Sequence, residues 1–158
     1  MTDQRFEVLA AAERDMLEAM LDFHREAMLR KTSDLSDDQL RASPVGSGTN
    51  LIGLVHHLTR VEEWWFEGCF AGGPFDGDPP HEHQAPVGAT YEEIVAGYHR
   101  QCERSREIAR QAQLEDVAAF PFMKPTLRWV LVHMIEETAR HNGQADVIRE
   151  LTDGATGE

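Results

Sequence analysis

The sequence predicts an all-α protein, a four-helix bundle formed by one domain over residues 1–158. Two observations support this prediction. Apolar residues recur at intervals of three and four along four long segments, which is the spacing of amphipathic helices. The segments between them are rich in Gly, Pro and Asp, and no stretch alternates apolar and polar residues as a half-buried strand does. Helices joined by such loops pack as a bundle around one core.

Composition narrows the classes of function. The chain has 15 Lys and Arg against 28 Asp and Glu, a formal net charge of -13, which would repel nucleic acid and anionic membranes. The first residues lack the basic and then apolar pattern of a signal peptide, and no apolar run is long enough to span a bilayer. We therefore expect a soluble, cytoplasmic protein that acts on a small molecule and binds neither nucleic acid nor membrane.

The first helix is expected over residues 6–30, followed by a short extra helical turn. His24 lies within ~40° of the apolar stripe of this helix, so it is either a hydrogen-bonded core histidine or a residue of a pocket. The spacing of Ser36 and Gln39 is that of a capping box. It predicts the extra turn, which ends near Leu40.

The second helix carries two adjacent histidines. Thr49 can cap this helix, and a continuous apolar face follows. His57 lies ~100° from the centre of that face and His56 ~160° from it, so only His57 is expected to look inward. Trp64 and Trp65 are expected in the core or in a pocket wall.

The segment between the second and third helices is predicted to be a surface loop, because residues 71–88 are rich in Gly, Pro and Asp. It contains His81 and His83 in an HxH pattern. Two histidines in an acidic loop can bind a metal, but we expect these to be solvated. A capping box beginning at Thr90 opens the third helix, on which Cys102 is expected to be a small buried residue rather than a nucleophile.

The last helix, expected over residues 126–152, carries the strongest functional signal. Glu137 and His141 fall in the same narrow band as the core residues Val130, Met134, Ala145 and Ile148. Burying an ionised Glu costs several kcal/mol unless the carboxylate is paired or binds a metal. Glu137 and His141 are one turn apart, so both can reach one ion. Alternatively, Glu137 pairs with a buried Arg from another helix.

The remaining candidates are ranked by their position around the same axis. His133 lies ~80° from His141 and Glu136 ~140° from it, which predicts His133 at the rim of the site and Glu136 in solvent. A third ligand must come from another helix, and His57 is the best-placed histidine. The two cysteines form no CxxC pair, so a metal site here would use His57, Glu137 and His141 and keep a fourth position open.

Two stretches of the sequence resemble a known family. SGTNLIGLVHHLTRVEEWWF (residues 47–66) and LRWVLVHMIEETARHNGQAD (residues 127–146) are similar to the DinB/YfiT superfamily of metalloenzymes. The resemblance is closest to the branch that contains mycothiol-dependent maleylpyruvate isomerase. It covers nearly the whole chain and implies a DinB-like four-helix bundle, often dimeric, with one divalent metal ion.

The resemblance also implies which residues hold the ion. In this family one histidine comes from the second helix and two ligands, one turn apart, come from the last. These positions fall on His57, Glu137 and His141 here, and the metal implied is zinc, with nickel possible. No residues of a thiol-binding site can be matched, so the cofactor-binding residues stay unassigned.

Three functions are compatible with such a site. A metal-bound low-molecular-weight thiol, mycothiol or a similar one, would be a thiolate at neutral pH, able to transfer sulfur to a small electrophile or to isomerise it. His24, His133 or Arg140 could then supply a proton or hold a carboxylate. The alternatives are a metal-hydroxide hydrolase of an amide or thiol conjugate, and a metal-binding or structural bundle without catalysis.

Overall fold

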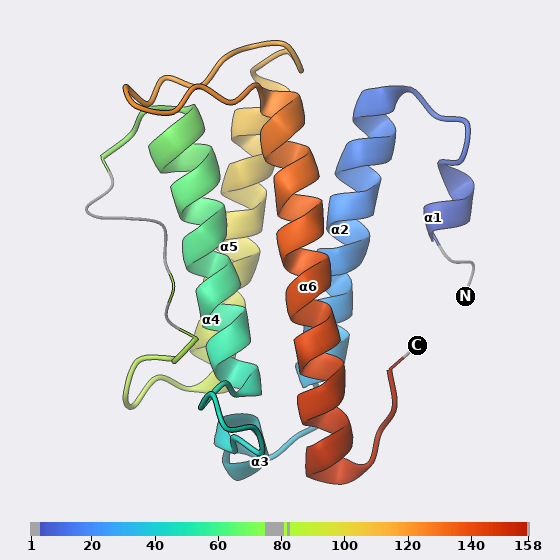
Figure 1. The fold of residues 1–158 in the computed structure, drawn as a ribbon, viewed down its shortest axis with the longest axis vertical. Coiled ribbons are helices and arrows are strands. Elements are labelled where there is room, and N and C mark those ends of the chain that lie inside the picture. The colour runs from blue at the N-terminus through green and yellow to red at the C-terminus, as the bar shows by residue number, and fades with distance from the viewer. Residues whose placement is uncertain (1–3, 75–80, 82, 158) are drawn as a thin grey trace.

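The computed structural model describes residues 4–74, 81 and 83–157. In this part of the chain four long helices run side by side, as Figure 1 shows, and no β-strand is formed. They are α2 (Glu13–Thr32), α4 (Leu51–Glu62), which continues as the π-helix η1 (Glu63–Phe70), α5 (Tyr91–Arg110) and α6 (Leu127–Asp153). The prediction of an all-α four-helix bundle is confirmed.

The first predicted helix is divided in two. The short helix α1 (Gln4–Glu7) lies beside α2 and is separated from it by a turn. Leu9, between the two helices, is 77% exposed. Burial of its side chain therefore does not favour a longer α2 at the N-terminal end. The start of α2 is instead held by Arg14. Its guanidinium donates hydrogen bonds to the carbonyl oxygens of Ala109 and Ala112, at and just after the end of the third long helix.

Most of the predicted helix ends are confirmed. The extra turn is α3 (Asp37–Arg41), and it begins with the Ser36 capping box. Thr90 and Thr126 cap α5 and α6, respectively. The cap of α4 is Asn50 rather than Thr49, since the Asn50 side chain accepts a hydrogen bond from the backbone N–H of Gly53.

The π-helix η1 was not predicted from the sequence. Its wider turn is closed by hydrogen bonds such as that from the N–H of Ala71 to the carbonyl oxygen of Phe66, five residues earlier. As a result three consecutive aromatic residues, Trp64, Trp65 and Phe66, are all buried. This confirms the prediction that both tryptophans lie in the core or in a pocket wall.

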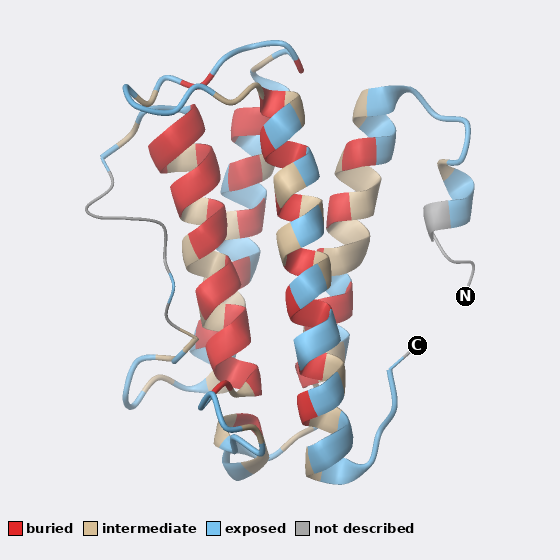
Figure 2. Ribbon diagram, viewed as in Figure 1, coloured by how far each residue is buried: buried red, intermediate tan, exposed pale blue. Residues whose placement is uncertain are grey.

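The core consists of two apolar clusters, and Figure 2 shows buried residues along all the long helices. Along α6, Met134 belongs to the first cluster and Ala145 to the second. The buried positions between them are polar: Thr138, His141 and Asn142. The bundle therefore has a polar layer between two apolar ends. None of its helices, within the described ranges, is long and apolar enough to cross a membrane.

Candidate metal centre

The three residues predicted as ligands, His57, Glu137 and His141, lie together in the polar layer; we refer to them as the ligand triad. Oε1 of Glu137 is 3.0 Å from Nε2 of His141 and 3.4 Å from Nε2 of His57. The first contact follows from the one-turn spacing on α6, and the second from the packing of α4 against α6. His57 and His141 are buried, and Glu137 is mostly buried.

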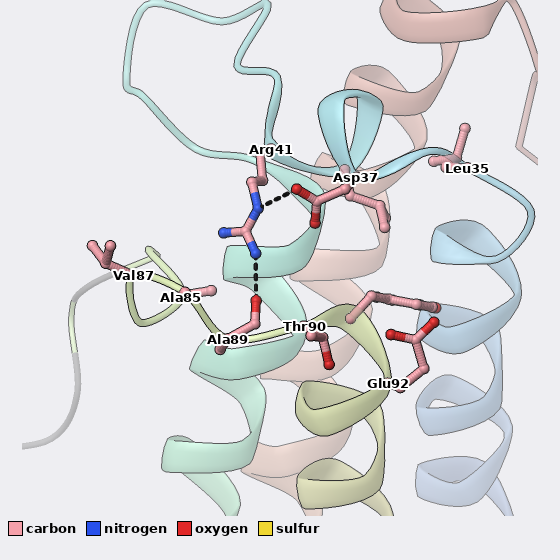
Figure 3. Close-up of a pocket in the computed structure, with 11 residues that line it drawn as sticks. Leu35, Asp37, Arg41, Ala85, Val87, Ala89, Thr90 and Glu92 are labelled. Atoms are coloured by element: carbon pink, nitrogen blue, oxygen red, sulfur yellow. Dashed lines mark hydrogen bonds and ion pairs between the residues drawn. The ribbon is translucent and has the colours of Figure 1, made fainter.

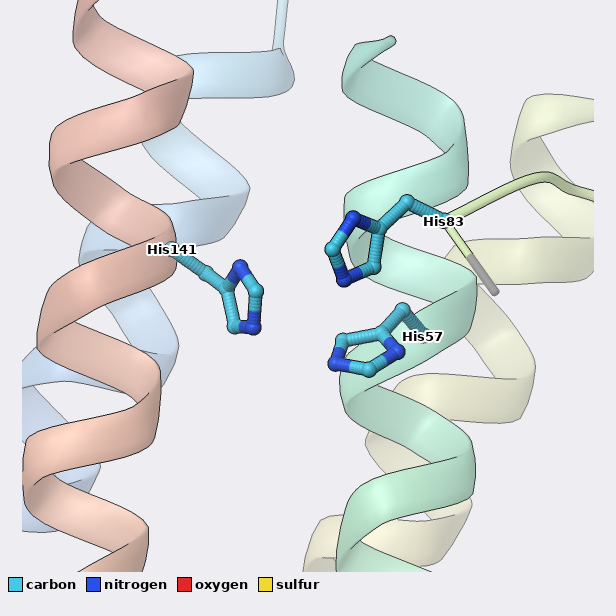
Figure 4. A group of neighbouring side chains, drawn as sticks. All are labelled: His57, His83 and His141. Carbon is cyan, nitrogen blue, oxygen red and sulfur yellow. The ribbon is translucent and has the colours of Figure 1, made fainter. Parts of the chain in front are cut away.

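A third imidazole joins this group. His83 lies with its ring centroid 4.3 Å from that of His57 and 5.0 Å from that of His141. Figure 4 shows all three rings pointing into the space between α4 and α6. Each ring offers one nitrogen, and these nitrogens lie within 4.8 Å of one another. The expectation that His83 is solvated is therefore wrong: the chain after the loop folds back over α4 and brings this half-buried side chain to the ligand triad.

Sequence reasoning missed His83 because its segment has the composition of a surface loop. His81, the other histidine of the pair, is indeed exposed. The HxH pattern itself was the available signal, and helical periodicity contains no information about where an irregular segment folds back. The position of His83 depends on a tertiary contact.

The hydrogen bonding of His141 indicates that a cation belongs between it and Glu137. Nδ1 of His141 donates to Oε1 of Gln144 at 2.8 Å. In a neutral imidazole the other nitrogen, Nε2, then bears a lone pair, and it faces the Glu137 oxygen 3.0 Å away. Two acceptors at this distance attract each other only through a cation, which is either a proton or a metal ion. A partner such as Gln144 is the usual means of orienting a metal-binding histidine.

The charges of the site suit a divalent ion. When the cation between Glu137 and His141 is a proton, hydrogen bonds from His141 and His57 hold the pKa of Glu137 well below its usual range, so its carboxylate is ionised at neutral pH. Burial, with the neighbouring His57 and His141, lowers the pKa of His83 to about 4. Metal ligation requires an ionised carboxylate and neutral imidazoles. The carboxylate of Glu137 and the imidazole of His83 meet these conditions.

The distances also fit a metal. In a tetrahedral zinc site with bonds of ~2.0–2.1 Å to nitrogen, two ligand atoms are ~3.3 Å apart. The separations within the ligand triad, 3.0 Å and 3.4 Å, are close to this value. In addition, Nδ1 of His57 is buried and has no hydrogen-bond partner among the described groups. A divalent ion can thus be held by His57, Glu137 and His141 with little movement of the helices.

The ligand triad lies in a cavity of about 390 Å³. His133 and Arg140 also line it, together with Trp65 from η1. His133 stacks on Trp129 with ring centroids 5.0 Å apart, and its side chain is 24% exposed, at the rim as predicted. Arg140 reaches Glu136, whose carboxylate is exposed as expected, at 3.3 Å. The full lining is His57, Val61, Trp65, His81, His83, His133, Glu137, Arg140, His141 and Gln144.

His24, the remaining candidate for a catalytic role, lies elsewhere. It does not line this cavity, and its carbonyl oxygen accepts a hydrogen bond from the side chain of Asn142. Asn142, which follows His141 on α6, thus connects α6 to α2. The ring nitrogen Nδ1 of His24 lies 3.5 Å from the side-chain nitrogen of Asn142, and His24 is half-buried outside both core clusters.

A larger cavity, of about 650 Å³, lies away from the polar layer, between α3 and the start of α5 (Figure 3). Its most prominent charged group, Arg41, donates hydrogen bonds to Asp37 and to the carbonyl oxygen of Ala89. The charge of Arg41 is thereby balanced by Asp37, and the lining brings together no histidines or cysteines. We assign it no chemistry.

A second carboxylate is buried close to the polar layer. Glu62 is fully buried and accepts two hydrogen bonds of 2.7 Å from Nε and Nη2 of Arg25. Arg25 also donates to Asp22 at 2.8 Å. The alternative in which a buried Arg pairs with Glu137 is therefore wrong, because the buried Arg25 is bound by Glu62. The helical pattern of the sequence did not predict that Glu62 is a core residue.

Both cysteines are free and buried. Burial, with the charge of Glu62 close by, raises the pKa of Cys102 to about 12, and burial also raises the pKa of Cys69. Neither is a thiolate at neutral pH, which confirms that Cys102 is a small buried residue. A sulfur nucleophile at this site has to come from outside the protein.

Comparisons with known proteins agree with the fold. The family model described as mycothiol-S-transferase matches residues 16–154. Among the solved structures, a conserved protein from Enterococcus faecalis superposes with a TM-score of 0.68; it is 17% identical, and the match covers 92% of this chain and 100% of that one. At this identity the likeness shows the fold alone. Among proteins with curated descriptions, none matches the sequence significantly.

Proposed function

Because the chain belongs to the mycothiol-S-transferase family, we propose that it is a metal-dependent enzyme that transfers a low-molecular-weight thiol, mycothiol or a similar one, to a small electrophile. The observation that supports this most is that Oε1 of Glu137 lies within 3.4 Å of the Nε2 atoms of both His57 and His141. These groups lie at one wall of a cavity large enough for a small molecule.

The ion we propose is zinc, which takes imidazole and carboxylate ligands. When bound, it lowers the pKa of a thiol and so supplies the thiolate that the buried Cys69 and Cys102 do not provide. In the overall reaction a carbon–sulfur bond forms and the bond from that carbon to the leaving group breaks. The proton of the thiol ends on the leaving group or in solvent.

The residues around the ligand triad have separate roles in this proposal. Arg140, whose side chain is 66% exposed at the cavity, holds an anionic group of the electrophile or of the thiol. His133 is fixed by its stacking on Trp129 and presents an imidazole to the cavity, where it exchanges a proton with the leaving group. Gln144 keeps Nε2 of His141 directed at Glu137. Both substrates are small molecules. We further propose that the protein is a homodimer and that it acts in the cytoplasm.

The test combines metal analysis with an assay for thiol transfer. Protein purified without a His tag should contain stoichiometric divalent metal, and metal-loaded protein should join mycothiol or cysteine to chlorodinitrobenzene. His57→Ala should lose both the metal and the activity. His56→Ala, which changes the adjacent histidine outside the ligand triad, should keep both and is the matched control.

Three results would contradict the proposal. Without stoichiometric metal, the central claim fails. Metal-loaded protein that hydrolyses a thiol conjugate but forms none would indicate the metal-hydroxide hydrolase. Metal-loaded protein that does neither would indicate a metal-binding bundle without catalysis.

A further inference from the structure

His83 has a feature that the other histidines of the site lack: it is attached to an irregular segment. His57 and His141 project from the helices α4 and α6, and their hydrogen-bonded backbones fix where their rings begin. The backbone of His83 has no helical hydrogen bonds, and its side chain is only half-buried. Of the four groups around the site, His83 is therefore the one that can leave with the smallest loss of structure.

The position of His83 is nevertheless specified by the sequence of α4. Gly53, one helical turn before His57, is buried, and the carbonyl of His83 rests directly on it. A Cβ atom at position 53 would lie 2.1 Å from the carbonyl oxygen of His83. No other residue type could allow this approach without moving the segment. The glycine thus forms a seat for His83 over the imidazole of His57, as Figure 4 shows for the two rings.

We propose that His83 is a fourth, exchangeable ligand of the metal site, seated by Gly53, and that a thiol must displace it to bind. This inference rests on the proposed function for the identity of the ion. It adds a ligand that the helices do not supply. With four protein ligands a zinc site is closed, whereas a catalytic site keeps one position open, so His83 determines which of the two states the site adopts.

An exchangeable ligand has a quantitative signature. If His83 occupies the fourth position for most of the time, it strengthens metal binding by some factor. It weakens the apparent binding of an external thiol by about the same factor, since only the fraction of sites without His83 can accept the thiol. Removal of His83 should therefore shift the two affinities in opposite directions. A ligand that never leaves, or a residue that only packs, would not do this.

The experiment uses the full-length protein loaded with Co²⁺, whose absorption reports on coordination, and 2-mercaptoethanol as the thiol. For His83→Ala we expect a changed Co²⁺ spectrum, a dissociation constant for Co²⁺ that is higher by roughly 10-fold to 100-fold, and a thiol titration midpoint that is lower by a similar factor. The control is His56→Ala, which changes a histidine of α4 that does not line this cavity and should leave all three unchanged.

A second variant tests the seat without altering the imidazole. Gly53→Ala should displace His83 and shift the Co²⁺ and thiol affinities in the same directions as His83→Ala. Its matched control is Gly97→Ala on α5, where an added Cβ would meet only the end of the Arg100 side chain at 3.8 Å. Circular dichroism of each variant verifies that the bundle is folded.

The outcomes separate this inference from the proposed function. If the unchanged protein binds no stoichiometric metal, the proposed function and this inference fail together. If it binds metal, but His83→Ala has the same spectrum and affinity, His83 is not a ligand and only this inference is overturned. If His83→Ala weakens metal binding without tightening thiol binding, His83 is a permanent ligand and the exchange is wrong.

Discussion

The bundle buries two carboxylates, and it satisfies them in opposite ways. Glu62 on α4 is fully buried, and both of its oxygens accept hydrogen bonds from the guanidinium of Arg25. Glu137 on α6 is mostly buried, and the groups that face one of its oxygens are two imidazole nitrogens. The first arrangement has matched charges and a planar two-bond geometry. In the second, the partners of the carboxylate are imidazoles, which are themselves common metal ligands.

The comparison shows how to tell a structural ion pair from a metal site in a core. Desolvation of the carboxylate is costly in both cases, and each needs a cation. At Glu62 the cation is part of the chain. At Glu137 the chain provides two imidazoles, of which His141 is oriented by its hydrogen bond with Gln144, and a cavity lies alongside. A buried carboxylate whose partners are also metal ligands indicates a site for an external ion.

The largest expected effect is on the buried ion pair of Arg25 and Glu62. Arg25→Met would leave the buried Glu62 without its cation and should lower the free energy of unfolding by about 3–5 kcal/mol. Urea denaturation followed by circular dichroism measures this, with no metal added. The double variant Arg25→Met with Glu62→Leu should recover most of the loss. A cost below about 1 kcal/mol for the single change would mean that the pair is not what stabilises this layer.

For Glu137 the expected effect is on how much added zinc raises the free energy of unfolding. In the unchanged protein, free zinc at about 100 times its dissociation constant should raise the free energy of unfolding by about 2.7 kcal/mol. In Glu137→Gln the same zinc concentration should give less than half of that increase, since one ligand has lost its charge. Urea denaturation with and without zinc provides the measurement. An equal increase in the two proteins would remove Glu137 from the metal site.

The smallest expected effect concerns Asp22, a carboxylate that also binds Arg25. Asp22 receives hydrogen bonds of 2.8 Å from both Arg25 and Arg106. Burial acts to raise the pKa of Asp22, but the hydrogen bonds from Arg106 and Arg25 together with their charges outweigh it and hold this pKa below its usual value. A carboxyl whose pKa is lowered by folding stabilises the protein above its unfolded pKa, near 3.9, and this contribution disappears as the pH falls through the folded value.

Asp22→Asn should therefore cost up to about 1 kcal/mol at neutral pH, as partly exposed ion pairs do. The difference from the unchanged protein should shrink as the solution is acidified below the usual carboxyl range. Unfolding free energies at neutral and acidic pH test this sign. A difference that stays constant over the whole range would show that the charge of Asp22 is not the source of the effect.

Helical periodicity was sufficient to predict the bundle and to place two of the three proposed ligands, Glu137 and His141, beside each other on α6. Glu137 and His141 were identified because their spacing places both on the buried side of α6. His57 required the same count on α4 together with the family resemblance. In each case the relevant distance along the chain is a few residues, so the helix itself determines the arrangement.

The features that were missed depend on contacts between distant segments. His83 reaches the site through its contact with Gly53, thirty positions earlier by sequence number. Glu62 is a core residue only because Arg25 on another helix binds it. The break between α1 and α2 and the wide turn of η1 depend on what each segment packs against. No local pattern contains this information, because the partners are set by the fold as a whole.

The wide turn of η1 has a consequence for how this kind of site can diversify. His57 is fixed by the α-helical part of the same continuous segment, and Trp65 is placed by the π-helical part that follows. The wall of the cavity can therefore rotate relative to the metal ligands when the length of residues 63–70 changes. A variant with one residue inserted or deleted in residues 63–70 should therefore change the shape of the cavity while His57 keeps its place on α4.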